Sequence, residues 1–369
     1  MSHLFSPANL GSLALDNRIV VAPMCQYSAI DGNLTDWHLM HLGQYAVGGA
    51  GLVFVEATGV EAEGRITPGC PGLYNDDNEA QMARVVQFYR DYGAAKIGIQ
   101  LAHAGRKASA DLPWNGGTAL SADQGAWETS SASALPYADG WHTPTALSDQ
   151  GLERVLQAFV QAAKRAVRVG FDAIEVHAAH GYLLHQFLSP LSNQRDDAYG
   201  GSLENRMRFP LEVFTAVREV APDVPVGVRF SATDWVEGSG WALPEATEFS
   251  SKLKELGCDF IDVSSGGNSP LQDIKVGPGY QVSFADHIKR ETGLATMAVG
   301  MITDPRQAET IVATGQADFV ALARGMLYDP RWPWHAAETL RAQATFPPQY
   351  MRSHPTLRGE PIPGNPPKK

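Results

Sequence analysis

Cysteine is scarce in this sequence, and the few cysteines present are not spaced for cross-links. Only Cys25, Cys70 and Cys258 occur among 369 residues, and no Cys-x-x-Cys pair is found. An odd number of widely separated cysteines predicts neither a disulfide framework nor a zinc ribbon. We therefore expect reduced thiols and a cytoplasmic protein.

Basic charge and long apolar runs are also lacking. The sequence has 29 lysines and arginines against 40 aspartates and glutamates, which gives a net charge of −11. This balance leaves no broad basic surface for a phosphate backbone, so nucleic acid is not expected as a partner. No apolar run approaches the roughly 18 residues of a membrane span, and the N-terminal segment shows no targeting signal, so no membrane association is expected.

Short β-rich apolar runs recur along the chain, and most are followed by a polar or glycine-rich segment and then a helix-like stretch. Such runs predict strands. We predict eight strands, at residues 19–22, 52–56, 97–101, 173–177, 226–230, 260–264, 296–299 and 319–322.

Helical patterns lie between the predicted strands. One apolar stripe, over 152–167, stops at Gly170, and a second ends before Gly257. A third begins with Pro305 near its first position and ends before Gly315. Because strands and helices alternate, the strands are expected to pair in parallel, and eight such units predict a closed (β/α)8 barrel, a TIM barrel of the α/β class. An open, doubly wound sheet is disfavoured, because its usual Gly-x-Gly-x-x-Gly turn does not follow the first strand.

Residues 1–369 are interpreted as a single barrel domain with two additions. The segment 103–147, after the third strand, is rich in serine, alanine, glycine and tryptophan and is too long for a simple connection. It is predicted to cap the barrel mouth. The tail, 347–369, contains prolines and lysines and is expected to lie against a neighbour or to be partly loose.

The residues just after each strand are the candidates for function, because barrel enzymes carry out their chemistry at that end. Gly300, Arg324 and Gly325 follow the seventh and eighth strands, where barrels often hold a phosphate. A second interpretation stays open on these residues alone. The glycines would then only form turns, and the arginine would pair with a surface carboxylate.

A His177-x-x-His180 pair follows the fourth strand. Two histidines can hold a divalent metal, which needs a third ligand and favours hydrolysis, or they can donate two hydrogen bonds to one carbonyl oxygen. Metal-dependent barrel hydrolases usually have a His-x-His pair after the first strand, where this chain has Met24 and Cys25. No metal is therefore expected, although the spacing also fits two structural histidines.

These motifs resemble one family, the Old Yellow Enzyme family, and the resemblance covers the chain from about Leu4 to Arg352. Several long motifs match in order and at the expected strand ends. Cysteine at position 25 and the His-x-x-His pair are similar to the bacterial subgroup that includes xenobiotic reductases. The matching segments are 17–19, 22–25, 56–58, 98–107, 177–182 and 197–206.

The resemblance implies non-covalently bound FMN, with NADPH or NADH as the hydride donor. Gln100 would bond the pyrimidine edge of the isoalloxazine, and Arg229 would place positive charge near N1 and O2. Cys25 would tune the flavin, since nothing nearby in the sequence supplies a base to make it a nucleophile. The cofactor-binding residues implied by the resemblance are Ala22, Pro23, Met24, Cys25, Ala57, Gln100, Arg229, Gly300, Ala323 and Arg324.

Activated alkenes are the substrates that the resemblance implies: α,β-unsaturated carbonyl, imide or nitro compounds. His177 and His180 would bond the electron-withdrawing oxygen. Tyr182 would protonate the α-carbon, unless it is only an aromatic wall, and Tyr27 would donate a hydrogen bond to the substrate. The xenobiotic-reductase branch can carry a tryptophan after the seventh strand, where this chain has only small and aliphatic residues over 297–301, so substrate size is open.

Arg352 resembles the C-terminal arginine that members of this subgroup extend into a partner's active site. The resemblance therefore implies a homodimer or a dimer of dimers. Trp332, Trp334 and Tyr350 are expected to be exposed near this arginine and to serve as interface anchors. The alternative for Arg352 is a solvated tail charge.

Other barrels that bind FMN or phosphate are the alternatives to an ene-reductase. A dihydroorotate-type oxidase and a phosphate-binding isomerase would share the expected phosphate site. A non-enzymatic FMN-binding protein is a third alternative. Reduction of the flavin by NADPH and its reoxidation by an alkene separate an ene-reductase from all three.

Overall fold

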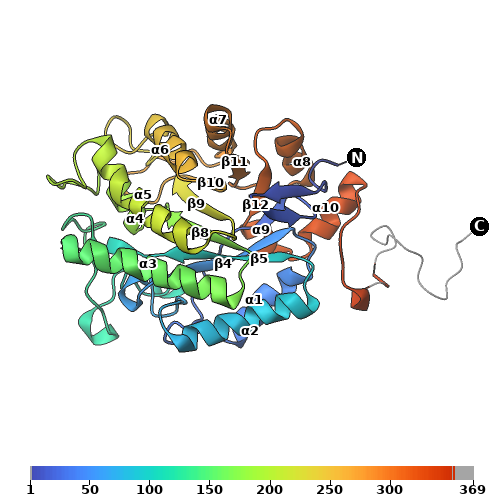
Figure 1. The fold of residues 1–369 in the computed structure, drawn as a ribbon, viewed down its shortest axis with the longest axis horizontal. Coiled ribbons are helices and arrows are strands. Elements are labelled where there is room, and N and C mark those ends of the chain that lie inside the picture. The colour runs from blue at the N-terminus through green and yellow to red at the C-terminus, as the bar shows by residue number, and fades with distance from the viewer. Residues whose placement is uncertain (1, 351, 354–369) are drawn as a thin grey trace, which may run out of the picture.

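Eight parallel strands form a closed barrel in the computed structural model, which describes residues 2–350, 352 and 353 (Figure 1). Strand β12 pairs with β3 and so closes the ring. The predicted (β/α)8 barrel is thus confirmed. In chain order the barrel strands are β3 (Ile19–Val21), β4 (Leu52–Gly59), β5 (Lys96–Ala102), β8 (Ala173–Ala178), β9 (Val226–Ser231), β10 (Phe260–Ser264), β11 (Ala295–Ala298) and β12 (Phe319–Leu322).

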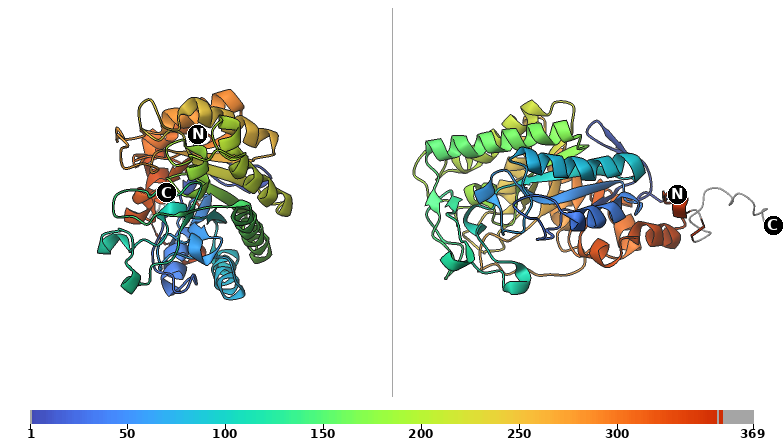
Figure 2. Two further views of the ribbon diagram at one scale, coloured as in Figure 1. Left: turned by 90° about the vertical axis from the view of Figure 1, so that its left-hand side faces the viewer. Right: turned by 90° about the horizontal axis from the view of Figure 1, so that it is seen from below.

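Helices surround the barrel, as the end view of Figure 2 shows. The three predicted helices are confirmed: α3 ends at Val169 with Gly170 in a left-handed conformation (φ 91°), α6 ends shortly before Gly257, and α8 begins at Pro305. The helices are α1 (Asp36–Ala46), α2 (Asp76–Tyr92), α3 (Asp149–Val169), α4 (Leu183–Leu188), α5 (Leu203–Val220), α6 (Leu243–Glu255), α7 (Val282–Thr292), α8 (Pro305–Ala313), α9 (Arg324–Tyr328) and α10 (Trp332–Leu340).

An N-terminal hairpin, which the sequence analysis did not predict, packs against the inside of the barrel. Its strands are β1 (Ala8–Leu10) and β2 (Leu13–Leu15). Leu10 and Leu15 are buried together with inward-facing residues from the beginnings of the barrel strands. The hairpin therefore plugs the N-terminal end of the barrel. Strands of three residues are too short to show the alternation that predicts a strand.

The segment 103–147 lies at the end of the molecule opposite to α10, as the right-hand view of Figure 2 shows, with the segment in teal and α10 in red. It contains short 3-10 helices and two strands, β6 (Ser130–Ser131) and β7 (Thr145–Ala146), which pair in parallel. Arg195, after α4, donates hydrogen bonds to the carbonyls of Ala132 and Leu147 and so ties this segment to the barrel.

The expectation that two C-terminal tryptophans are exposed is wrong. Trp332 is 6% and Trp334 is 7% exposed, because both pack within their own chain. The indole of Trp332 donates to the Thr303 carbonyl (2.8 Å), and Trp334 stacks edge-on with Tyr350. Only Tyr350 is exposed; position 351 and residues 354–369 of the predicted tail lie outside the described residues.

No helix in the described part of the chain is both long enough and apolar enough to span a membrane.

Substitution of Gly227 should destabilise the barrel. A Cβ at this position would lie 2.5 Å from ring carbons of Phe260, which is fully buried and cannot move aside. We expect Gly227→Ala to lower the free energy of unfolding by about 1–3 kcal/mol, the usual cost of overpacking a core. The measurement is a urea titration followed by fluorescence.

The matched control is Gly277→Ala, because a Cβ at Gly277 meets no atom within 4 Å. This variant should stay within about 0.5 kcal/mol of the parent protein. Equal stability of the two variants would contradict the packing that we describe.

Candidate active site

Three aromatic side chains converge just beyond the end of β8. His177 and His180 stack edge-on with ring centroids 5.2 Å apart, and His177 and Tyr182 do so at 5.1 Å. His177 is still on the strand, whereas His180 has a left-handed backbone (φ 58°) that turns the chain back toward His177. The turn brings together the three residues that the sequence analysis named as catalytic.

The two histidines are neutral hydrogen-bonding groups. The pKa of each imidazole lies well below its ordinary value. Burial is the largest cause, and the positive charge of Arg229 is the second. Nδ1 of His177 accepts the backbone N–H of Ala179 (3.2 Å), so its proton is on Nε2. Nε2 of His180 lies 2.7 Å from the hydroxyl of Ser264 on β10.

The backbone of the His180 turn is held by Lys107, for which the sequence analysis assigned no role. Its Nζ donates to the carbonyls of His180 and Gly267, each at 2.9 Å. Burial lowers the pKa of Lys107 to about 8. A Cβ at Gly181 would lie 2.3 Å from the Gly267 carbonyl oxygen, so the loops after β8 and β10 touch without room for side chains.

A buried histidine–aspartate contact supports the same turn from inside the protein. The backbone N–H of Gly181 donates to Nδ1 of His185 (2.9 Å), and Nε2 of His185 lies 3.0 Å from Oδ1 of Asp234. Asp234 also accepts hydrogen bonds from Ser189 and from the backbone of Trp241. The contacts leave little freedom for the positions of the two site histidines.

The loop after β3 lies beside this cluster. Ala22 is buried, whereas Pro23, Met24 and Cys25 are partly exposed. Tyr27 has a left-handed backbone (φ 53°), and burial raises its pKa above the ordinary value. Burial also raises the pKa of Tyr182, so both phenols keep their protons at neutral pH.

Cys25 is hydrogen-bonded to Cys70, although the sequence analysis treated the two as unrelated. The segment around Gly69 packs directly on the Tyr27 backbone and brings Cys70 to this place. The hydrogen bond with Cys70 is the largest cause that raises the pKa of the Cys25 thiol, and burial is the second. A protonated thiol is a poor nucleophile, and the tuning role expected for Cys25 stays a prediction.

A pocket of about 430 Å³ opens after β11 and β12 and carries positive charge. Arg229 and Arg324 line it, and none of its lining residues is a carboxylate. Within the described residues, the Arg324 side chain has no ion pair. Gly300 is buried at the pocket wall with φ 127°, a conformation that a side chain would strain. Tyr280 and Gln281 also line the pocket, and sequence reasoning missed both.

The floor of the site carries polar residues inside the barrel. Nε2 of Gln100 donates to Oε1 of Glu175 (2.7 Å), which leaves the Gln100 carbonyl oxygen to accept from a ligand. Nε of Arg229 lies 3.2 Å from Oδ2 of Asp262. Sequence reasoning did not select Glu175 or Asp262, because a strand residue facing the barrel interior has no signal of its own in a sequence.

These residues fit FMN. A pocket with two arginines, a glycine wall and no carboxylate suits a phosphate. The free carbonyl oxygen of Gln100 suits an N–H of a flavin ring, and Ala57, at the end of β4, is small enough to lie beside that ring.

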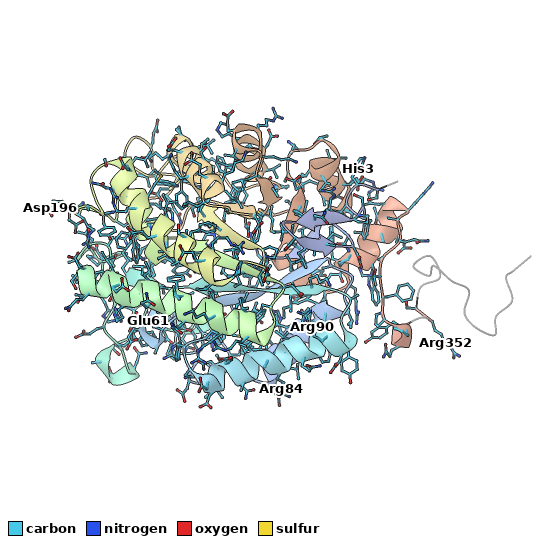
Figure 3. All side chains as sticks on the ribbon, in the orientation of Figure 1. His3, Glu61, Arg84, Arg90, Asp196 and Arg352 are labelled. Carbon is cyan, nitrogen blue, oxygen red and sulfur yellow. The ribbon has the colours of Figure 1, made fainter. Side chains whose placement is uncertain are left out.

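Arg352 lies apart from all of the other site residues. Figure 3 shows it at one end of the long axis with His3, whereas Glu61 and Asp196 lie toward the other end. Glu61 bonds His103 directly after β5 and so marks the C-terminal end of the strands. Arg352 is exposed, and it does not reach the site of its own barrel.

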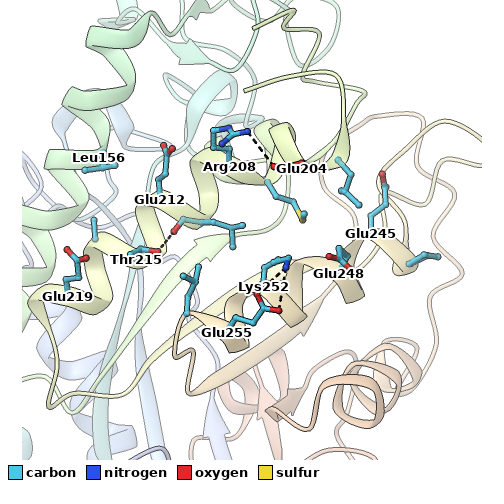
Figure 4. Close-up of a pocket in the computed structure, with 16 residues that line it drawn as sticks. Leu156, Glu204, Arg208, Glu212, Thr215, Glu219, Glu245, Glu248, Lys252 and Glu255 are labelled. Carbon is cyan, nitrogen blue, oxygen red and sulfur yellow. Dashed lines mark hydrogen bonds and ion pairs between the residues drawn. The ribbon is translucent and has the colours of Figure 1, made fainter. Parts of the chain in front are cut away.

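A larger concavity on the outside of the barrel lacks the features of this site. The groove of about 1160 Å³ lies between α3, α5 and α6, and none of its lining residues is on a barrel strand (Figure 4). Several glutamates and an ion pair between Lys252 and Glu255 surround its aliphatic base. In the described ranges, no three potential metal ligands (His, Cys, Asp or Glu) converge at one place.

An anion pocket, a polar floor and paired neutral histidines at the mouth of a (β/α)8 barrel define the class as a flavin-dependent oxidoreductase. The chain belongs to the NADH:flavin oxidoreductase / NADH oxidase family, whose sequence pattern matches residues 3–343, and thus to the Old Yellow Enzyme family. FMN is its cofactor, and a nicotinamide nucleotide is its hydride donor.

Relatives and solved structures support this membership. An NADPH dehydrogenase of Geobacillus sp. (strain WCH70) is 44% identical over 351 residues, which cover 95% of this chain and 98% of the relative. Morphinone reductase superposes with a TM-score of 0.77 at 30% identity, over 98% of this chain and 94% of that chain. A morphinone reductase in complex with tetrahydroNAD superposes with a TM-score of 0.76 at 28% identity, over 99% of this chain and 96% of that chain.

Loss of the Arg324 side chain should weaken FMN binding. A hydrogen bond to a charged group contributes about 1.5–3 kcal/mol, so Arg324→Met should raise the Kd for FMN about 10- to 100-fold. Titration of the apoprotein with FMN, followed by flavin fluorescence, measures this. Arg306→Met, on the exposed side of α8, is the control and should keep the parent Kd. An unchanged Kd for Arg324→Met would remove this arginine from the phosphate site.

Proposed function

We propose that this protein reduces the C=C bond of α,β-unsaturated carbonyl, imide or nitro compounds at the expense of NAD(P)H. The observation that carries the proposal is the pair of neutral imidazoles, His177 and His180, whose rings converge beside Tyr182. Two neutral imidazoles that donate to one substrate oxygen stabilise the negative charge that develops there during addition to the β-carbon.

The residues around the pair divide the remaining tasks. Nε2–H of His177 and the His180 ring bind the substrate oxygen, and bound FMN supplies the hydride that it receives from the nicotinamide. Tyr182 keeps its proton because burial raises its pKa, so it has a proton to deliver to the α-carbon. Tyr27, from the opposite loop, donates a hydrogen bond to the substrate.

The same proposal includes the residues that would hold FMN. Gly300, Ala323 and Arg324 would bind the phosphate, and Gln100 and Arg229 would contact the pyrimidine side of the ring. Arg229 would compensate the negative charge of the reduced ring. The residues that would line the flavin are Ala22, Pro23, Met24, Cys25 and Ala57.

Arg352 serves the active site of a partner in this proposal, and the functional unit is a homodimer. The support is its position, since it is exposed at the end of the barrel away from its own site. In an isologous dimer each protomer lends its arginine to the other. Tyr350, two residues before Arg352, packs against Arg331, whose guanidinium lies 4.7 Å from the Tyr350 ring.

Removal of both histidines should slow alkene reduction without loss of FMN. For His177→Ala with His180→Ala we expect reoxidation of the reduced enzyme by cyclohexenone to slow about a hundredfold, the usual cost of losing donors to a developing oxyanion. Reoxidation by molecular oxygen, which needs no such donors, is the internal control and should be unchanged. Stopped-flow absorbance measures both rates. A colourless double variant would place the histidines at the cofactor and not at the substrate.

Mixed dimers test the role of Arg352. Arg352→Ala subunits combined with His177→Ala, His180→Ala subunits should recover activity, because one site of each mixed dimer then carries both defects and the other carries none. Differently tagged subunits allow purification of the mixed species before the assay. Absence of recovery in verified mixed dimers would show that Arg352 does not act across an interface.

A further inference from the structure

Two carboxylic acids lie inside the barrel beneath the candidate flavin site, with only one cation between them. Glu175 on β8 and Asp262 on β10 are 0% and 1% exposed. Strand β9 runs between them and carries Arg229 directly opposite Asp262. The three residues come from adjacent strands, so their charges interact in a region closed to water.

Arg229 forms its ion pair with Asp262, and its positive charge also acts to lower the pKa of Glu175. Its Nε lies 3.2 Å from Asp262, whereas Glu175 accepts a hydrogen bond from the neutral amide of Gln100. Among the described residues, Oε2 of Glu175 and Oδ1 of Asp262 have no hydrogen-bond partner. Two buried carboxylate oxygens without partners are costly, and a proton on one of the acids relieves that cost.

The contacts of the two acids favour Glu175 as the one that holds the proton. If both acids were ionised, two negative charges would share one arginine in a dry interior. The pKa of Glu175 is raised to about 8, mainly by burial and secondly by the negative charge of Asp262. Burial also raises the pKa of Asp262, although the charge of Arg229 acts to lower it. Asp262 has Arg229 as counter-ion, so the proton stays on Glu175.

Among the described residues, the third buried acid on a barrel strand, Glu56 of β4, lies 3.4 Å from His38 of α1 and is not among the charges that shift the pKa of Glu175 or Asp262. Gln100 faces it from β5, His177 lies two residues beyond Glu175 on β8, and Arg229 faces it from β9. Within the described chain, the residues that β3, β4, β11 and β12 contribute to the inner core are apolar: Val20, Leu52, Phe54, Met297, Phe319 and Ala321. The pair is therefore electrostatically connected to the flavin site through Gln100 and Arg229.

We propose that Glu175 and Asp262 form a proton-holding pair that is coupled through Arg229 to the redox state of the flavin. The inference rests on the proposed function, in which Gln100 and Arg229 contact the pyrimidine side of bound FMN. Transfer of a hydride to FMN leaves one additional negative charge near Arg229. Arg229 then compensates two anions instead of one, and the pair retains its proton more strongly.

The proton balance depends on pH. Below the pKa of Glu175, about 8, the pair holds its proton in both redox states, and reduction takes up only the hydride. Above it, the oxidised enzyme has lost this proton, and reduction draws one proton from solvent onto the pair. Glu175 is in this sense a positioning residue for charge, and it touches neither substrate nor the reacting atoms.

The test is the equilibrium constant for flavin reduction, measured anaerobically on the holoenzyme against a reference dye from about pH 6 to about pH 9.5. For a couple of two electrons and one proton, the equilibrium constant for reduction changes about tenfold per pH unit. One additional linked proton makes that change about a hundredfold per pH unit. We expect the tenfold dependence below about pH 8 and the steeper one above it, where Glu175 titrates.

Glu175→Gln keeps the size of the side chain and the Gln100 contact but cannot titrate, so it should show the tenfold dependence throughout. Glu204→Gln, on the exposed surface of α5, is the matched control and should keep the break. Asp262→Asn is the second variant. Without the Asp262 charge, Glu175 ionises more readily beside Arg229, so the change in slope should move from about pH 8 to lower pH. A protonated carboxyl band in the infrared spectrum at neutral pH should be absent from Glu175→Gln.

Two results would overturn the proposal of a proton-holding pair. The parent enzyme could show the tenfold pH dependence throughout, or the change in slope could persist in Glu175→Gln. Failure of the proposed function gives a different result: the protein would bind no FMN, or its reduced flavin would not react with an alkene. Normal alkene reduction with no break rejects the proton-holding pair alone.

Discussion

The contact between the loops after β8 and β10 is the constraint on which the geometry of the site depends. Gly181 and Gly267 allow the two backbones to touch, and Lys107 joins their carbonyls through its buried ammonium group. Because His180 adopts a left-handed conformation within this contact, its ring turns back toward His177. A side chain at either glycine would separate the loops and with them the two donors.

Arg229 gives the site its electrostatic character. It is the cation that, after burial, lowers the pKa of His177 and His180, and it is also the counter-ion of Asp262. One buried charge therefore keeps the substrate-side histidines neutral and, in our proposal, compensates the reduced flavin. The same charge connects the chemistry above the barrel floor with the acids below it.

The sequence predicted what depends on neighbours along the chain. Strand positions, the end of α3 at Gly170 and the start of α8 at Pro305 follow from local patterns of apolar residues, glycine and proline. Contacts between distant segments were not predictable: Cys25 meets Cys70, and Lys107 bonds the loop at Gly267, only because the barrel closes. The exposure expected for Trp332 was wrong because a loop carbonyl satisfies its indole. The roles of the site residues stay predictions.

The central claim is that hydride passes from a nicotinamide to an activated alkene through FMN held in this barrel. The most direct test is an anaerobic spectrum of the purified protein, first with one equivalent of NADPH and then with cyclohexenone or maleimide. We expect the yellow colour to bleach with NADPH and to return with the alkene, with formation of the saturated product. Bleaching that only oxygen reverses would contradict alkene reduction and would indicate an oxidase instead.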